Sequence, residues 1–110
     1  KITPKGITLN IKYHHGAVPL MVPRDNPYLK SAMRAMQKAF GKEPVLVRHG
    51  ASVPITATFM RVLNAPPLFV GLGLEGDQIH SPNERFKLSH FYNGIIFGVH
   101  LYNELGKSGH

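Results

Sequence analysis

The sequence predicts a mixed chain of the α/β or α+β class, in which short strands alternate with amphipathic helices. Three observations lead to this prediction. An alternating apolar segment lies at residues 7–13, three further segments have helical apolar spacing, and a continuous apolar run covers residues 68–74. In order along the chain, these elements predict strand, helix, strand over residues 1–48 and helix, strand, helix over residues 49–110.

The first half is expected to begin with a strand that is buried on one face. Its alternating apolar side chains are Ile7, Leu9, Ile11 and Tyr13. Asp25 or Asn26 can cap a following helix that has Pro27 in its first turn. Gly41 is typical of the end of such a helix, and a short strand over residues 44–47 follows. The apolar stripe of this helix consists of Leu29, Ala32, Met33, Met36, Ala39 and Phe40.

The second half is expected to begin with a helix. Ser52 and Pro54 mark its start and Leu63 marks its end. Its predicted buried face consists of Ile55, Phe59, Val62 and Leu63. The apolar run at residues 68–74 is short enough to be a strand that is buried on both faces.

A last helix is predicted from Leu88 to Glu104, with Gly106 at its end. It contains Gly94 and Gly98, each of which costs about 1 kcal/mol relative to alanine in a helix interior. Close packing against a neighbouring element would explain these two glycines. The predicted apolar side consists of Leu88, Phe91, Tyr92, Ile95, Val99 and Tyr102.

The pattern of the two halves breaks at residues 49–51, where a histidine, a glycine and an alanine follow one another. A domain boundary is therefore predicted between residues 48 and 49. We expect the two parts to contact each other little, so that the helix face around Met33 does not share a core with the face around Phe91.

The composition fits a globular chain and disfavours several classes of protein. No apolar run approaches the roughly 20 residues of a membrane helix, so no membrane partner is expected. The absence of cysteine excludes disulfides and thiolate metal sites and favours a reducing compartment, the cytoplasm. The net charge of +7 comes from 13 basic and 6 acidic residues, but the basic residues are scattered, so no nucleic-acid partner is expected.

Four motifs occur in order along the chain. They read His15-Gly16-Ala17-Val18-Pro19, Phe40-Gly41, Arg48-His49-Gly50-Ala51-Ser52-Val53-Pro54 and His80-Ser81-Pro82-Asn83-Glu84. From about residue 7 to residue 105, the chain resembles the zinc-dependent peptidase family of carnosinases, cytosolic dipeptidases, aminoacylases and glutamate carboxypeptidases. Two positions depart from the family pattern, because Ala17 and Ala51 stand where the family has glycine.

The resemblance covers only the C-terminal part of such enzymes. It implies that residues 1–48 are the C-terminal half of a lid, or dimerisation, domain and that residues 49–110 are the C-terminal part of the catalytic domain. It further implies a hydrolase with two zinc ions, a peptide or N-acyl amino-acid substrate, and a homo-oligomer. We expect the chain alone to be inactive and to bind zinc weakly, since most ligands would lie outside it.

The resemblance also gives roles to single residues. His80 matches a metal ligand of the family. Ser52 and Gly50 match a loop that holds the substrate carboxylate, and amides at the start of a helix favour an anion. Arg48 could pair with that carboxylate or form a surface salt bridge. His15 is expected to bind the substrate or to polarise the scissile carbonyl.

Asn83 and Glu84 are expected to fix the turn after His80 rather than to contact the substrate. The remaining histidines are interpreted as exposed or hydrogen-bonded side chains, because no His-Glu-x-x-His or His-x-His motif occurs. Two other functions stay open. One is a non-catalytic self-association module, and the less favoured one is a basic nucleic-acid-binding domain.

Overall fold

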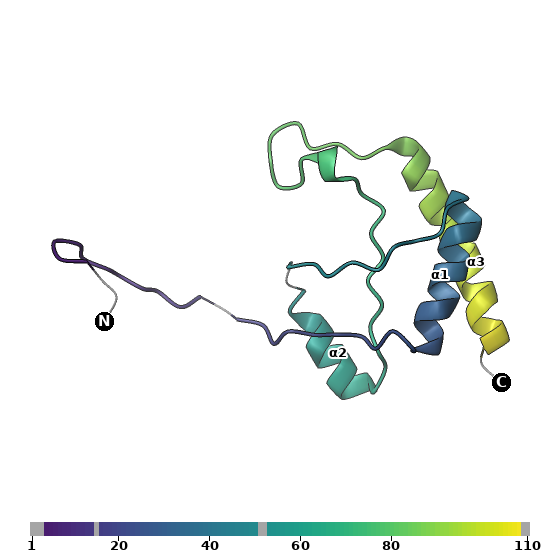
Figure 1. Cartoon of the computed structure of the whole chain (residues 1–110), viewed down its shortest axis with the longest axis horizontal. Coiled ribbons are helices and arrows are strands. Elements are labelled where there is room, and N and C mark those ends of the chain that lie inside the picture. The colour runs from purple at the N-terminus through teal and green to yellow at the C-terminus, as the bar shows by residue number, and fades with distance from the viewer. Residues whose placement is uncertain (1–3, 15, 51–52, 109–110) are drawn as a thin grey trace.

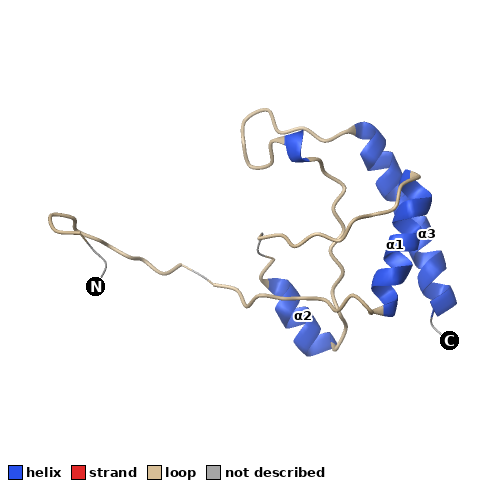
Figure 2. Ribbon diagram, viewed as in Figure 1, coloured by secondary structure: helices blue, strands red, loops and turns tan. Residues whose placement is uncertain are grey.

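The computed structural model describes residues 4–14, 16–50 and 53–108, and all regular secondary structure in these ranges is helical (Figure 2). The elements are α1 (Pro27–Phe40), α2 (Ile55–Leu63), the short 3-10 helix η1 (Glu75–Asp77) and α3 (Leu88–Ser108). The three predicted helices therefore form where the sequence placed them. The predicted α/β class is wrong for the described part of the chain.

The three predicted strands are the cause of this difference. Residues 7–13, 44–47 and 68–74 run as chain without regular structure (Figure 2). A strand forms only where a second strand pairs with its amide and carbonyl groups, and an alternating pattern does not say where that partner is. Ile11 is 79% exposed and Val45 is 84% exposed, so the faces predicted to be buried are uncovered.

The molecule is extended rather than compact. Its radius of gyration is 18.8 Å, whereas a compact chain of this length has a radius of about 13 Å. Residues 4–14 project away from the helices as a long arm (Figure 1). Among the described residues, no helix has both the length and the apolar character needed to cross a bilayer.

Local signals at both ends fix α1. The Asn26 side chain accepts a hydrogen bond from the Tyr28 amide at 2.9 Å, and Pro27 occupies the first turn. At the other end, Gly41 adopts a left-handed backbone with φ of 70° and its amide donates to the Gln37 carbonyl at 2.8 Å. The predicted caps of this helix are confirmed.

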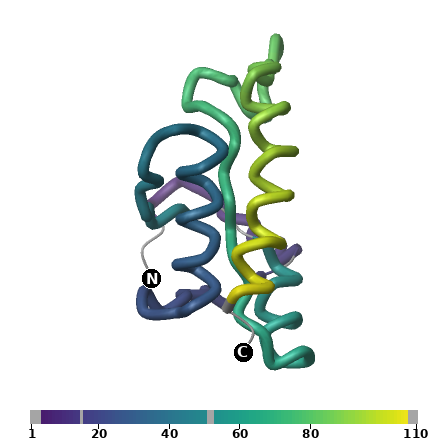
Figure 3. The backbone as a smooth tube through the Cα atoms, turned by 90° about the vertical axis from the view of Figure 1, so that its right-hand side faces the viewer, coloured from purple at the N-terminus to yellow at the C-terminus, as the bar shows by residue number. Residues whose placement is uncertain are grey.

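Helices α1 and α3 run antiparallel and pack side by side (Figures 1 and 3). The small residues Ala32 and Ala35 of α1 are 5% and 0% exposed and allow close approach, and Phe97 of α3 is 8% exposed. Because α1 precedes residue 48 and α3 follows it, the expectation that the two parts contact each other little is wrong. The position of the domain boundary itself stays a prediction.

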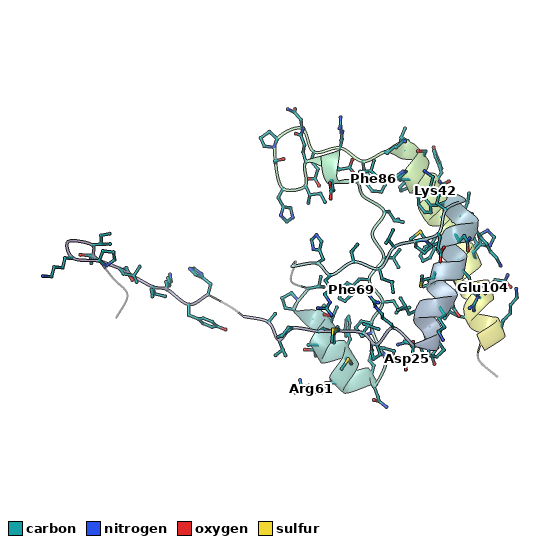
Figure 4. All side chains as sticks on the ribbon, viewed as in Figure 1. Asp25, Lys42, Arg61, Phe69, Phe86 and Glu104 are labelled. Carbon is teal, nitrogen blue, oxygen red and sulfur yellow. The ribbon has the colours of Figure 1, made fainter. Side chains whose placement is uncertain are left out.

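A buried carboxylate joins the two helices. Glu104 of α3, whose side chain is 5% exposed, accepts from Lys38 Nζ at 2.6 Å and from Arg34 Nε at 2.7 Å (Figure 4). Lys107 Nζ lies 3.6 Å from the same carboxylate. The hydrogen bonds from Lys38 and Arg34 lower the pKa of Glu104 to about 2.

The predicted apolar faces of α2 and α3 are exposed. Phe59 and Val62 of α2 are 48% and 68% exposed, and no residue of α2 is buried. On α3 the exposed fractions include 52% for Phe91 and 68% for Val99. The predicted buried face of α2 is therefore wrong for this chain, whereas the apolar side predicted on α3 is present and exposed. The prediction that Gly106 ends α3 is also wrong, since the helix continues to Ser108.

The segment 68–74 lies against α3. The Nδ1 atom of His90 is 2.9 Å from the Leu72 carbonyl oxygen, and the His90 ring meets Phe40 of α1 edge to face at 5.5 Å. A Cβ atom added to Gly94 would lie 2.6 Å from Leu72 Cδ1. The expected close packing is confirmed for Gly94. It is wrong for Gly98, where an added Cβ would meet nothing within 4 Å.

Candidate functional site

His80 lies on a loop of residues 78–84 between η1 and α3, at the top of Figure 1. Asp77 closes the start of this loop. Its amide donates to the Leu74 carbonyl at 3.0 Å, and its carboxylate Oδ2 accepts from the Leu74 amide at 2.7 Å. Asp77 is 5% exposed, so this reciprocal pair of bonds is shielded from water.

Arg85 closes the other end of the loop. Its amide donates to the Asp77 carbonyl at 3.0 Å, and its Nε donates to the Gly76 carbonyl at 3.2 Å. We call the four hydrogen bonds among Leu74, Gly76, Asp77 and Arg85 the Asp77–Arg85 clamp. The clamp fixes both ends of the His80 loop against each other.

The backbone of the loop is unusual. Gln78, His80 and Asn83 have left-handed φ angles of 55°, 62° and 63°. Such φ angles are unfavourable for residues that carry a side chain. Ser81 adds a turn, because its hydroxyl and its amide both donate to the Gln78 carbonyl, at 2.7 and 3.1 Å. The loop therefore has a defined and unfavourable conformation.

His80 is exposed to solvent on this loop. A neutral imidazole can bind a metal ion through either ring nitrogen. However, the described residues contain no group of three histidine, cysteine, aspartate or glutamate side chains that could hold a metal ion. Taken alone, the part of the chain that the structure describes does not fit a complete metal site, and His80 can offer one ligand.

The other predicted site residues lie elsewhere or outside the described ranges. Arg48 and Gly50 are exposed on the segment that crosses the middle of Figure 1, below the His80 loop. His15 and Ser52 fall outside the described residues. Of the described positions, Arg48 and Gly50 lie on a different segment from His80. The roles of all these residues stay predictions.

Asn83 and Glu84 follow His80 directly. Both are exposed, and the left-handed φ of Asn83 turns the chain after Pro82. The turn that the sequence predicted at these residues is present. Whether Asn83 and Glu84 support His80 in a metal site stays a prediction.

An open groove of about 630 Å³ lies between α1 and two segments without regular structure. Lys42 and Phe69, both labelled in Figure 4, mark these two segments. Most of the lining is apolar and comes from Leu29, Ala32, Met33, Met36, Phe40, Val45, Leu46, Phe69, Val70, Leu72 and Leu74. The groove thus places residues 44–46 and 69–74 beside α1 and the first turns of α3.

Comparison with known proteins decides which family carries these motifs. The model of peptidase family M20/M25/M40 matches residues 2–104. The chain belongs to this peptidase family. The match includes both the His80 loop and the segment with Arg48 and Gly50, and the resemblance seen in the sequence is confirmed.

Two relatives illustrate the similarity. The chain is 35% identical over 82 residues to the Cys-Gly metallodipeptidase DUG1 of Saccharomyces cerevisiae, which is 74% of the chain and 17% of that enzyme. It is 29% identical over 92 residues to the human Beta-Ala-His dipeptidase, which is 84% of the chain and 18% of that enzyme. The chain therefore spans less than a fifth of the length of these relatives. No solved structure matches it significantly.

Sequence reasoning missed two residues of this family chain, Asp77 and Arg85. Asp77 stands three positions before His80 in a glycine-rich stretch, where the sequence shows only a short acidic turn. Its structural role follows from two hydrogen bonds that only the structure shows, since Asp77 accepts from the Leu74 amide and from the Arg85 amide. The only sequence signal was the apolar run at residues 68–74 directly upstream, because a carboxylate that is buried at the end of such a run needs a hydrogen-bond partner.

Proposed function

We propose that this chain is the C-terminal part of a metal-dependent dipeptidase and that His80 supplies one ligand to its metal site. The observation that carries the proposal is the exposed imidazole of His80 on a conformationally fixed loop, within the part of the chain that matches the peptidase family. Both relatives are named as dipeptidases. The substrate class proposed is therefore a dipeptide or a related N-acyl amino acid.

The metal proposed is zinc, with two ions in the complete active site. Nitrogen and oxygen ligands such as imidazole and carboxylate suit this ion, which at a catalytic site takes about three protein ligands. The described residues offer no such group, and the other ligands are proposed to come from the rest of the complete enzyme. We accordingly propose that the 110-residue chain does not hydrolyse peptides by itself.

The substrate carboxylate is proposed to bind at the segment around residue 50. Arg48 is exposed, and its guanidinium can form two parallel hydrogen bonds to a carboxylate. Gly50 leaves the backbone open, since nothing lies within 4 Å of a Cβ built there. Ser52 is proposed to complete this loop, and His15 is proposed to bind the substrate from the lid part.

Asn83 and Glu84 are proposed to shape the loop and thereby to support His80. They follow it directly, and the left-handed Asn83 sets the direction in which the chain leaves the loop. A residue that supports a metal ligand in this way orients the ligand without binding the metal itself. A cytoplasmic location and a homodimer also belong to this proposal.

The test uses the complete enzyme that contains this chain. His80→Ala is expected to lower the zinc content of the enzyme and to lower its dipeptide-hydrolysing activity by at least a hundredfold. His100→Ala, a change of the same kind on α3, is the matched control and is expected to leave both unchanged. Arg48→Ala is expected to raise KM for the dipeptide about tenfold while zinc content stays normal. Full zinc content and activity in the His80 variant would exclude the proposed role of this residue.

A second function, self-association, is supported by the uncovered apolar surface. Phe91, Ile95 and Val99 lie exposed on α3, and large exposed apolar patches mark interaction sites. The extended segment 68–74 also has no paired neighbour in the described part of the chain, and an unpaired apolar edge attracts another strand. Light scattering of the 110-residue chain over a concentration series tests this proposal, which predicts dimers or larger assemblies. A monomer at high concentration would exclude it.

A further inference from the structure

Three basic side chains converge on one carboxylate where α1 and α3 meet, at the residue labelled Glu104 in Figure 4. Lys38 Nζ and Lys107 Nζ lie 2.6 and 3.6 Å from its Oε1 atom, and Arg34 Nε lies 2.7 Å from its Oε2 atom. Glu104 is the only acidic residue in the sequences of both helices. One carboxylate charge therefore faces three cationic charges, and the cluster keeps a surplus of two positive charges.

Arg34 is held in one orientation by two buried groups. Its Nε atom donates to Glu104 at 2.7 Å, and its Nη2 atom donates to the Ser31 hydroxyl at 3.1 Å. Ser31 is fully buried, whereas the Arg34 side chain is 50% exposed. A guanidinium has five N–H groups in a planar fork, so these two bonds leave further donors for a ligand. Arg34 is thus both oriented in advance and accessible.

The two lysines lie beside this guanidinium and remain accessible as well. Their side chains are 45% exposed for Lys38 and 61% exposed for Lys107. Both ammonium groups approach the same carboxylate oxygen, so two like charges are close neighbours and a single negative charge offsets only part of their repulsion. Each ammonium has three donors. A second anion can therefore bind here while the contacts to Glu104 are kept.

We propose that Arg34, Lys38 and Lys107 bind a phosphate group that carries two negative charges. Such a group matches the surplus of two positive charges, and its oxygens accept hydrogen bonds from a guanidinium fork and from ammonium groups. A carboxylate or a nucleic-acid phosphodiester carries one charge and would leave part of the surplus. The site lies on α1 and α3, away from the His80 loop in the sequence, and does not depend on the proposed role of His80.

NMR titrations of the full 110-residue chain test the proposal, at constant ionic strength and at about pH 8, well above the second pKa of a phosphate ester. Inorganic phosphate and a short phosphoserine peptide are titrated separately, because both present the same doubly charged group. We expect saturable shifts of the amides around Arg34, Lys38 and Glu104, with a dissociation constant on the order of 1 mM. Acetate should bind about tenfold more weakly. The tighter of the two phosphate ligands identifies the source of the group.

Two variants separate the site from the net charge of the chain. Lys107→Gln removes the most exposed of the three cations and should weaken phosphate binding about fivefold. Lys12→Gln, on the exposed N-terminal arm, changes the net charge equally and is the matched control, with an expected change below about twofold. Arg34→Lys keeps the charge but loses the planar fork, and it should weaken binding about fivefold.

The absence of saturable shifts with both phosphate ligands would overturn the proposal. Equal affinity for acetate would also overturn it, because the surplus charge would then not select a doubly charged group. The same holds if Lys12→Gln weakens binding as much as Lys107→Gln, since net charge alone would then attract the anion. Unchanged affinity of Arg34→Lys would contradict the role of the oriented guanidinium. If this variant loses its helical circular dichroism signal, Lys38→Gln replaces it, with the same expected loss and the same meaning of an unchanged affinity.

Discussion

Gly94 and Gly98 stand one helical turn apart in α3, and the structure predicts unequal effects of the same substitution on stability at the two positions. Replacing a glycine in a helix interior by alanine stabilises the helix by about 1 kcal/mol. At Gly98 the new methyl group would meet nothing within 4 Å. We therefore expect Gly98→Ala to raise the free energy of unfolding by about 1 kcal/mol.

At Gly94 the methyl group would lie 2.6 Å from Leu72 Cδ1 and 3.8 Å from Leu72 Cγ. The Leu72 methyl group must move away, and because it ends a flexible, half-buried side chain the cost is at the low end of that for overpacking, about 1 kcal/mol. Subtracting the gain in helix propensity of about 1 kcal/mol leaves the stability about unchanged. The two variants should thus differ by about 1 kcal/mol, although both replace glycine by alanine.

The assay is urea unfolding followed by the helical circular dichroism signal, with a double-mutant cycle. Leu72→Ala removes the atoms that the new methyl group would meet. In this background Gly94→Ala should stabilise the protein as much as Gly98→Ala does. If Gly94→Ala is as stabilising as Gly98→Ala in the parent chain, then segment 68–74 does not lie against α3 as described, and the reasoning is refuted.

Three further predictions concern the end of α1, the ion cluster and the metal. Gly41→Ala forces a side chain into a left-handed backbone of φ 70° and should destabilise the chain by about 1 kcal/mol in urea unfolding; an unchanged midpoint would contradict this. The pKa of Glu104 is lowered from 4.5 to about 2 by Lys38 and Arg34, so its stabilising contribution is complete above pH 4.5 and is lost as the pH falls towards 2. Glu104→Gln should remove this part of the pH dependence between pH 4.5 and 2, and an identical profile in the variant would argue against the ion cluster. Calorimetry of the 110-residue chain should show weak or no zinc binding, whereas submicromolar affinity that His80→Ala abolishes would reveal a complete site within this chain.

The sequence predicted the helices well because their signals are local. Asn26, Pro27 and Gly41 act within one turn of α1 and need no distant partner. The same holds for the turn after His80, where Pro82 and Asn83 bend the chain. The strand predictions were wrong because pairing is a property of two segments, and an apolar pattern describes one segment at a time.

The faces of the helices were harder to predict than their ends. The apolar stripe of α3 around Phe91 and Val99 is exposed, while α1 meets α3 through Ala32, Ala35 and the charged Glu104. Small residues allow two backbones to approach, and paired charges can be buried between them, but neither is prominent in a search for apolar stripes. The Asp77–Arg85 clamp was likewise hidden, since it depends on two backbone segments meeting across a loop.

The segments that failed as strands and the apolar side of α3 have one property in common. Residues 44–46 and 69–74 line the same apolar groove beside α1, and Phe91 and Val99 of α3 are exposed. Their apolar patterns are typical of surfaces that are removed from water, but an apolar pattern in one segment does not determine what covers it. The His80 loop differs, because the four hydrogen bonds of its clamp all join described residues between positions 74 and 85.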